Sequence, residues 1–128
     1  MLRYDIIPEG NIITAEGSGK IGAEELLAFF AALVQDKEFK PDSRIFFDAS
    51  RIESESTLTI PVIRQHDSFL AVANACSNVR LAVFAPEDHQ FGLAQAWVKE
   101  LGGLTIHARI FSDLSIAQLW LGVPVFVM

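Results

Sequence analysis

The sequence predicts a single α/β domain built on a mostly parallel sheet that is covered by helices, and two observations support this. Short apolar segments rich in Ile, Val and Phe alternate with segments whose apolar residues recur at helical spacing. The connections between them are short, which favours neighbouring parallel strands. A chain of 128 residues suits one core, so residues 1–128 are expected to form one domain.

Five segments have the length and composition of strands, and four have those of helices. The strands are expected at 4–7, 11–15, 44–48, 81–85 and 105–111, and the helices at 23–35, 60–77, 87–101 and 115–121. A turn-forming cluster, Pro8-Glu9-Gly10, separates the first two strands and predicts an antiparallel opening hairpin. The expected order is therefore ββαβαβαβα.

Local signals support the helix boundaries. Glu24 and Glu25 lie in the first turn of the first helix, where the helix dipole favours acids. Pro61 is tolerated in the first turn of the second. Ser115 and Gln118 have capping-box spacing at the start of the last helix, and Gly122 follows its end. Trp120 and Leu119 on that helix are typical of core residues, and the alternative for Trp97 and Trp120 is that they line a small apolar pocket.

Charge and composition exclude several classes of partner and location. The net charge of −6 opposes binding to nucleic acid and to anionic membranes. The longest apolar run, Leu26 to Val34, is too short for a membrane span, and the amino terminus lacks a secretory signal. Cys76 is the only cysteine, so no internal disulfide forms. A cytoplasmic protein is expected.

Several segments together resemble small bacterial SpoIIAA-like proteins of the STAS/SEC14 type. They are the opening hairpin, the helix from Ala23, Ile45–Asp48, Arg80–Pro86, Phe91–Ala94, Arg109–Asp113, and Ala117 with Trp120-Leu121. The resemblance covers nearly the whole chain and implies a SpoIIAA-like fold. Its motifs are mostly core patterns, so it says little about activity.

The same resemblance implies a candidate phosphoacceptor or partner-binding loop. In anti-sigma factor antagonists of the STAS superfamily, a strand ending Asp-Leu-Ser leads to an Asp-Ser dipeptide whose serine is phosphorylated. Asp48 and Ser50 match the first element, and Ser56 and Thr57 occupy the place of the second. The acid before the acceptor and the glycine after it are missing. The competing interpretation is a stretch of turn and capping residues.

A literal G-x-G-x-x-G motif, formed by Gly17, Gly19 and Gly22, precedes the first predicted helix, and Asp48 ends the next strand. This pattern is typical of a dinucleotide-binding loop. The preceding strand is short and partly polar, and the acid comes somewhat late. The competing interpretation is a plain turn.

No catalytic residue, cofactor or metal site is predicted. His66, His89 and His107 lie far apart without metal-ligand spacing, and no catalytic signature surrounds Cys76. His89 is expected at the surface or as a cap, and His107 as an outward strand residue. An enzyme would require Asp48, His89 and a hydroxyl to converge in one cleft.

The carboxyl-terminal residues 123–128 are all apolar or proline and must pack on something. Val125, Phe126 and Val127 are therefore a candidate interface, either with the same domain or in a homodimer.

The leading hypothesis is a non-enzymatic regulatory or interaction module with a protein partner. The alternative is a carrier or sensor of a small apolar ligand, because the chain contains ten phenylalanines. Nucleotide binding at the glycine motif is the third hypothesis.

Overall fold

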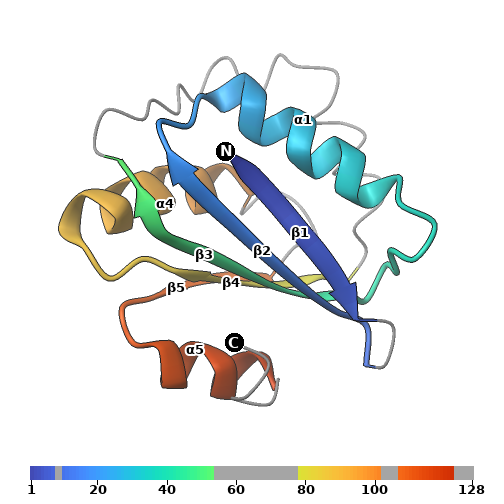
Figure 1. Cartoon of the computed structure of the whole chain (residues 1–128). Helices are drawn as coiled ribbons and strands as arrows, with labels where there is room; N and C mark the ends of the chain where they lie inside the picture. The colour runs from blue at the N-terminus through green and yellow to red at the C-terminus, as the bar shows by residue number, and fades with distance from the viewer. Residues whose placement is uncertain (8–9, 54–77, 102–106, 123–128) are drawn as a thin grey trace.

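The computed structural model describes residues 1–7, 10–53, 78–101 and 107–122, which form a five-stranded mixed sheet with three helices (Figure 1). In chain order the elements are β1 (Leu2–Ile7), β2 (Ile12–Gly19), α1 (Ala23–Val34), β3 (Arg44–Ile52), β4 (Arg80–Phe84), α4 (Asp88–Leu101), β5 (His107–Phe111) and α5 (Leu114–Leu121). The predicted α/β class is confirmed. The helix predicted at 60–77 lies outside the described residues.

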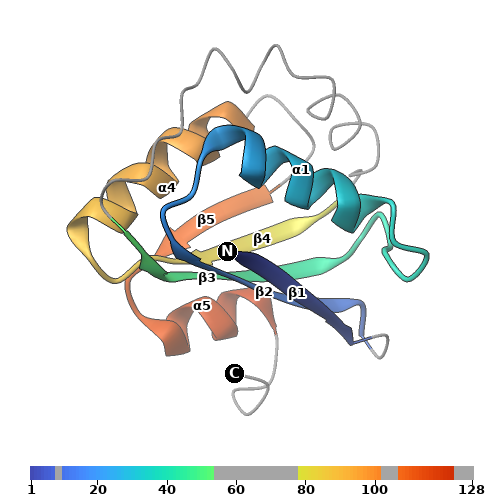
Figure 2. The same cartoon turned by 45° about the horizontal axis from the view of Figure 1, so that its top comes forward.

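The strands lie side by side in the order in which they occur along the chain. β1 pairs with β2 in the antiparallel sense, and β2, β3, β4 and β5 are parallel, as predicted. When each parallel strand lies on the same side of the one before it, right-handed crossover connections place their helices on one face of the sheet. Accordingly, α1 and α4 cover one face and α5 lies on the other (Figures 1 and 2).

The core is divided by the sheet into a large and a small cluster. The large cluster, under α1 and α4, has as its main members Ile13, Leu26, Phe30, Leu33, Ile45, Phe47, Leu81 and Val83. The small cluster, under α5, consists of Ile12, Phe46, Ala82, Ala117 and Leu121. Alternate residues of each strand enter opposite clusters, as the pleat requires.

β1 begins two residues earlier than the sequence predicts, at Leu2, and two other strands extend further at their carboxyl ends. β2 continues to Gly19 and β3 to Ile52, and the two remain paired through Ser18 and Arg51 beyond a register shift. The prediction that Asp48 ends its strand is therefore wrong. The strand continues because polar residues that a sequence pattern assigns to a loop are still paired by their backbone to a neighbouring strand.

The start of α5 also differs from the prediction. The N-cap is Asp113, whose Oδ1 accepts a hydrogen bond from the Ile116 backbone N–H at 3.1 Å, and Ser115 lies inside the first turn. The helix ends at Gly122, whose φ of 78° is the left-handed conformation that glycine adopts without strain.

Arg44, the first residue of β3, connects three parts of the fold. Its Nη1 donates to the Gly122 carbonyl oxygen at 2.7 Å and to that of Leu121 at 3.4 Å. Its Nη2 donates to the Gly10 carbonyl oxygen at 2.9 Å. A cation at this position also compensates the negative end of the α5 dipole. One side chain therefore fixes the end of α5 against the β1–β2 turn.

We expect Arg44→Met to lower the free energy of unfolding by about 1–2 kcal/mol, because it removes charge-assisted hydrogen bonds at a helix end. Arg80→Met is the matched control, since Arg80 is the exposed first residue of β4 and lies beside Arg44 in register. It should change stability by less than about 0.5 kcal/mol. Urea denaturation measures both, and equal effects would contradict the assigned role of Arg44.

Tyr4 joins β1 to the segment that follows α1. Its hydroxyl donates to Asp36 Oδ2 at 2.9 Å, and its ring meets Phe29 edge-on with centroids 5.7 Å apart. The pKa of Asp36 is lowered, first because the Glu38 backbone N–H donates to the carboxylate and second because Tyr4 does. The same hydrogen bond is the main reason that the pKa of Tyr4 is raised.

Tyr4→Phe should raise the pKa of Asp36 toward its ordinary 3.8 but not fully, since the Glu38 N–H still donates. A carboxyl group whose pKa is lowered by folding stabilises the folded state above the unfolded pKa, and this contribution disappears as the pH falls through the folded pKa. The part of the folding stability that Tyr4 contributes by lowering the pKa of Asp36 should therefore be lost as the pH falls through that pKa. NMR titration of the Asp36 carboxyl group measures the change, and an unaltered pKa would count against it.

Candidate functional site

The sheet face that carries α5 is only partly covered, and a polar depression of about 500 Å³ lies on its open part. It is lined by Arg3, Tyr4, Asp5, Thr14, Ala15, Glu16 and Asp48, from β1, β2 and β3. α5 contacts β3, β4 and β5 instead. The depression exists because the helix covers the other half of this face.

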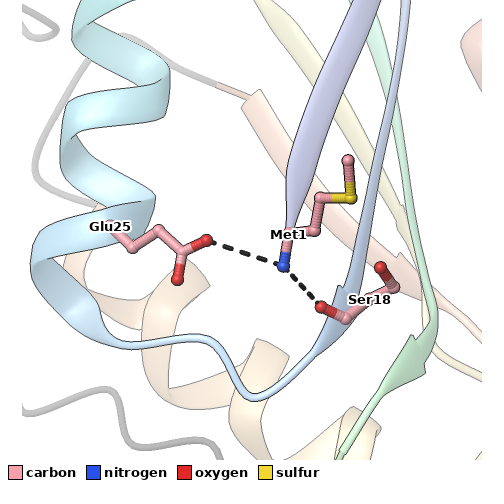
Figure 3. A network of polar contacts seen from close by, with 3 residues as sticks. All are labelled: Met1, Ser18 and Glu25. Carbon is pink, nitrogen blue, oxygen red and sulfur yellow. Dashed lines mark hydrogen bonds and ion pairs between the residues drawn. The ribbon is translucent and has the colours of Figure 1, made fainter.

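A second depression of about 220 Å³ adjoins the first, and it is lined by Met1, Arg3, Glu16, Ser18 and Arg51. The ion pair between Arg3 and Glu16 belongs to both. Figure 3 shows the Met1 amino group between the Ser18 carbonyl oxygen, at 2.6 Å, and Glu25, at 3.6 Å. Both depressions are lined mainly by polar and charged side chains, unlike the apolar pocket expected of a carrier.

Asp48 and Ser50, two of the predicted partner-loop residues, lie within β3. The Asp48 Oδ1 accepts a hydrogen bond from the Ser50 backbone N–H at 2.8 Å, and both residues are half-buried. Ser56 and Thr57 lie outside the described residues. In the first element of the candidate phosphoacceptor motif, Asp48 and Ser50 are thus joined by a hydrogen bond. The second element, Ser56 and Thr57, stays a prediction.

Asp48 and His89 do not meet. Asp48 faces the depression on the α5 side of the sheet, whereas His89 belongs to α4, on the other side. His89 is exposed, and its Nε2 lies 3.2 Å from the Ile52 carbonyl oxygen. The imidazole ring therefore contacts the end of β3. This geometry does not supply the acid–base pair that an enzyme built on these two residues requires.

Gln90 is a structural residue that sequence reasoning missed. It is buried, its Nε2 donates to the Ser50 carbonyl oxygen at 2.8 Å and to that of Ile52 at 3.3 Å, and its Oε1 accepts from the Glu87 N–H at 3.1 Å. The spacing of Glu87 and Gln90 matches the back-bonding half of a capping box, a signal that the sequence contains. Gln90 thereby fixes the end of β3 to the start of α4.

The glycine motif is mostly strand. Gly17 and Gly19 belong to β2, and only Gly22, which caps α1, lies in the connection. A Cβ added at Gly17 would lie 3.0 Å from Leu2 Cδ2 and 3.2 Å from Ile52 Cδ1, so this glycine permits close packing. The expectation of a loop at Gly17 and Gly19 is wrong, because backbone pairing with β1 and β3 extends the strand. Nucleotide binding stays a prediction that this geometry does not favour.

Gly17→Val should lower the free energy of unfolding by about 1–3 kcal/mol, although Val is a good strand former, because the added methyl groups overpack against Leu2 and Ile52. Gly92→Ala is the contrasting control. An added Cβ meets nothing within 4 Å there, and α4 should gain about 0.5–1 kcal/mol from helix propensity. Thermal denaturation distinguishes the two, and a neutral Gly17→Val would refute the packing role.

The outer face of α5 is the clearest apolar surface on the described residues. Leu119 is 82% exposed and Ile116 is 55% exposed, while Trp120 is half-buried against Phe111. The prediction that Leu119 is a core residue is therefore wrong. The helix buries Ala117, Gln118 and Leu121 instead, and Ala117 and Leu121 pack into the small cluster with Phe46 and Ala82.

The remaining predicted residues are less informative. Val125, Phe126 and Val127 lie outside the described residues, as do His66 and Cys76, and His107 is an exposed strand residue. Within the described ranges, no group of three or more His, Cys, Asp or Glu side chains is arranged to hold a metal ion. No helix in these ranges has the length and apolarity needed to cross a membrane.

Comparisons with protein-family models, curated proteins and solved structures gave no match. The resemblance to SpoIIAA-like proteins therefore stays a prediction from the sequence.

Proposed function

We propose that this protein is a non-enzymatic regulatory or interaction module that binds a protein partner through the outer face of α5. The observation that carries the proposal is the exposure of Leu119 and Ile116 beside Trp120 on that helix. Large apolar side chains grouped on a surface are typical of protein-binding sites.

The chemistry of α5 defines the partner. The helix contains no charged residue, although a fifth of the chain is charged and its net charge is −6. Ile116, Leu119 and Trp120 have the i, i+3, i+4 spacing of an amphipathic helix that enters an apolar groove. We therefore infer a partner protein with an apolar groove, and Trp120 supplies the aromatic side chain that often dominates such interfaces.

The end of β3 supports a regulatory role. Gln90 and His89 hold the carbonyl groups of Ser50 and Ile52 against α4. Ser56 and Thr57 follow a few residues later in the sequence. A Ser/Thr-containing sequence that follows a well-held strand end suits regulation by phosphorylation. The separation of Asp48 from His89 supports a function without acid–base catalysis.

Leu119→Glu tests the proposed surface. It places a charge where an apolar groove would close over the helix, so capture of the partner should fall at least tenfold, or about 1.4 kcal/mol. Gln95→Glu adds the same charge at an exposed position of α4, on the other face of the sheet, and should leave capture unchanged.

Quantitative affinity capture from cell extract, with wild type and both variants as baits, measures the effect. A protein retained by wild type and Gln95→Glu but lost with Leu119→Glu supports the proposal. No protein with that pattern, at equal folding by circular dichroism, would refute it.

A further inference from the structure

β1 is an edge strand whose outer side has no partner in the part of the chain that the structure describes. It pairs only with β2, and no strand lies beyond it in either view (Figures 1 and 2). Its six residues, Leu2–Ile7, contain no proline or glycine. Such an edge presents a row of backbone N–H and C=O groups that another strand can pair with.

The hydrogen-bond pattern identifies which residues present those groups. The Met1 amino group donates to the Ser18 carbonyl oxygen at 2.6 Å (Figure 3), and the Ser18 backbone N–H donates to the Met1 carbonyl oxygen at 2.9 Å. In an antiparallel ladder, alternate residues of a strand turn toward the same neighbour. Arg3 and Asp5 therefore turn toward β2, and Leu2, Tyr4 and Ile6 direct their backbone groups outward.

We propose that β1 pairs with β1 of a second copy of this chain, in the antiparallel sense, about a two-fold axis at Tyr4. The two sheets then become one continuous sheet. Tyr4 exchanges hydrogen bonds with Tyr4 of the second copy, and Leu2 with Ile6, so every outward-directed backbone group finds a matching one. The interface is isologous, as a two-fold dimer requires. This inference does not depend on the proposed role of α5.

Charge complementarity selects this register. With the axis at Tyr4, Arg3 lies directly opposite Asp5 of the second copy, and Asp5 opposite Arg3. These are non-hydrogen-bonded pairs, in which side chains approach most closely. Both side chains are exposed, and the Arg3 side chain is 70% exposed although its Nε contacts Glu16. A guanidinium group has five N–H donors, enough for a carboxylate on each side.

The neighbouring registers are disfavoured by the same charges. The residues with outward-directed backbone groups lie opposite each other only when the two-fold axis passes through a residue of β1. An axis midway between two residues would place them opposite residues whose backbone groups already pair with β2. An axis at Arg3 would place Arg3 opposite itself, and an axis at Asp5 would place Asp5 opposite itself. Like charges directly opposite each other are destabilising.

The other edge strand, β5, lacks this complementarity. His107 donates its N–H to Val79, so Ala108 and Ile110 are the outward residues. Pairing Ala108 with Ile110 of a second copy places Arg109 opposite Arg109, and pairing Ala108 with itself places His107 opposite Arg109. Among the described residues, β1 is therefore the self-complementary edge.

Complementary charge reversal tests the proposal. Asp5→Arg alone places Arg opposite Arg, and Arg3→Asp alone places Asp opposite Asp, so each variant should dimerise at least tenfold more weakly than wild type. An equimolar mixture of the two restores an opposite-charge pair at both positions and should form heterodimers. Sedimentation velocity over a concentration series of the untagged full chain measures all three.

Wild-type protein that stays monomeric throughout the series would overturn the proposal. So would dimers that neither variant weakens, or weakened variants that the mixture does not restore. Leu119→Glu should dimerise as wild type does, and a loss of dimer in that variant alone would assign self-association to α5 instead. Failure of partner capture through α5, in contrast, leaves the wild-type dimer intact.

Cross-linking tests the register without charge changes. In a Cys76→Ser background, Tyr4→Cys places the two new thiols opposite each other at a Cα separation of about 5.5 Å, within disulfide range. Leu2→Cys and Ile6→Cys each lie about 13 Å from their own counterparts. Oxidation should therefore give covalent dimers with Tyr4→Cys and not with the other two. Equal cross-linking of all three, or none with Tyr4→Cys, would contradict the register.

Discussion

The order in which the parallel strands are added governs the rest of this structure. Because β2, β3, β4 and β5 follow one another across the sheet, the described crossover helices α1 and α4 fall on one face. The other face then depends on an element that follows the last strand, and α5 provides it through the small cluster around Phe46. α5 covers only the β3–β5 side of this face, so the polar depression remains beside β1 and β2.

The sequence was a good guide wherever the signal is local and apolar. The strands at Arg44 and Arg80 and the helices at Ala23 and Asp88 begin within a residue or so of their predicted positions, because periodic burial defines them. Predictions failed where distant backbone decides the outcome. The residues near Gly17 in the sequence do not indicate that it lies in a strand. Nor do the neighbours of Arg44 indicate its role, since Arg44 donates hydrogen bonds to residues 34 and 78 positions away. The exposure of Leu119 depended on the rotation of one short helix.

The two surfaces with binding character lie on different parts of the molecule and use different chemistry. The outer face of α5 is apolar and uncharged, whereas the edge of β1 offers backbone groups with Arg3 and Asp5 alongside. Pairing through β1 leaves α5 open on each copy. A two-fold assembly of this kind presents two identical apolar faces, and two linked weak contacts give an apparent affinity far above that of one.

The way α5 is attached has a dynamic consequence. Every parallel strand of the sheet is held by backbone pairing, but α5 is held by side-chain packing and by Arg44. It joins no two described strands, so it can leave the sheet without breaking a strand pair. Release of α5 alone would expose Ile12, Phe46 and Ala82, and as a subglobal event it would require less free energy than global unfolding. In the part of the chain that the structure describes, the sheet thus has an apolar surface beneath α5 in addition to the apolar outer face of α5 itself.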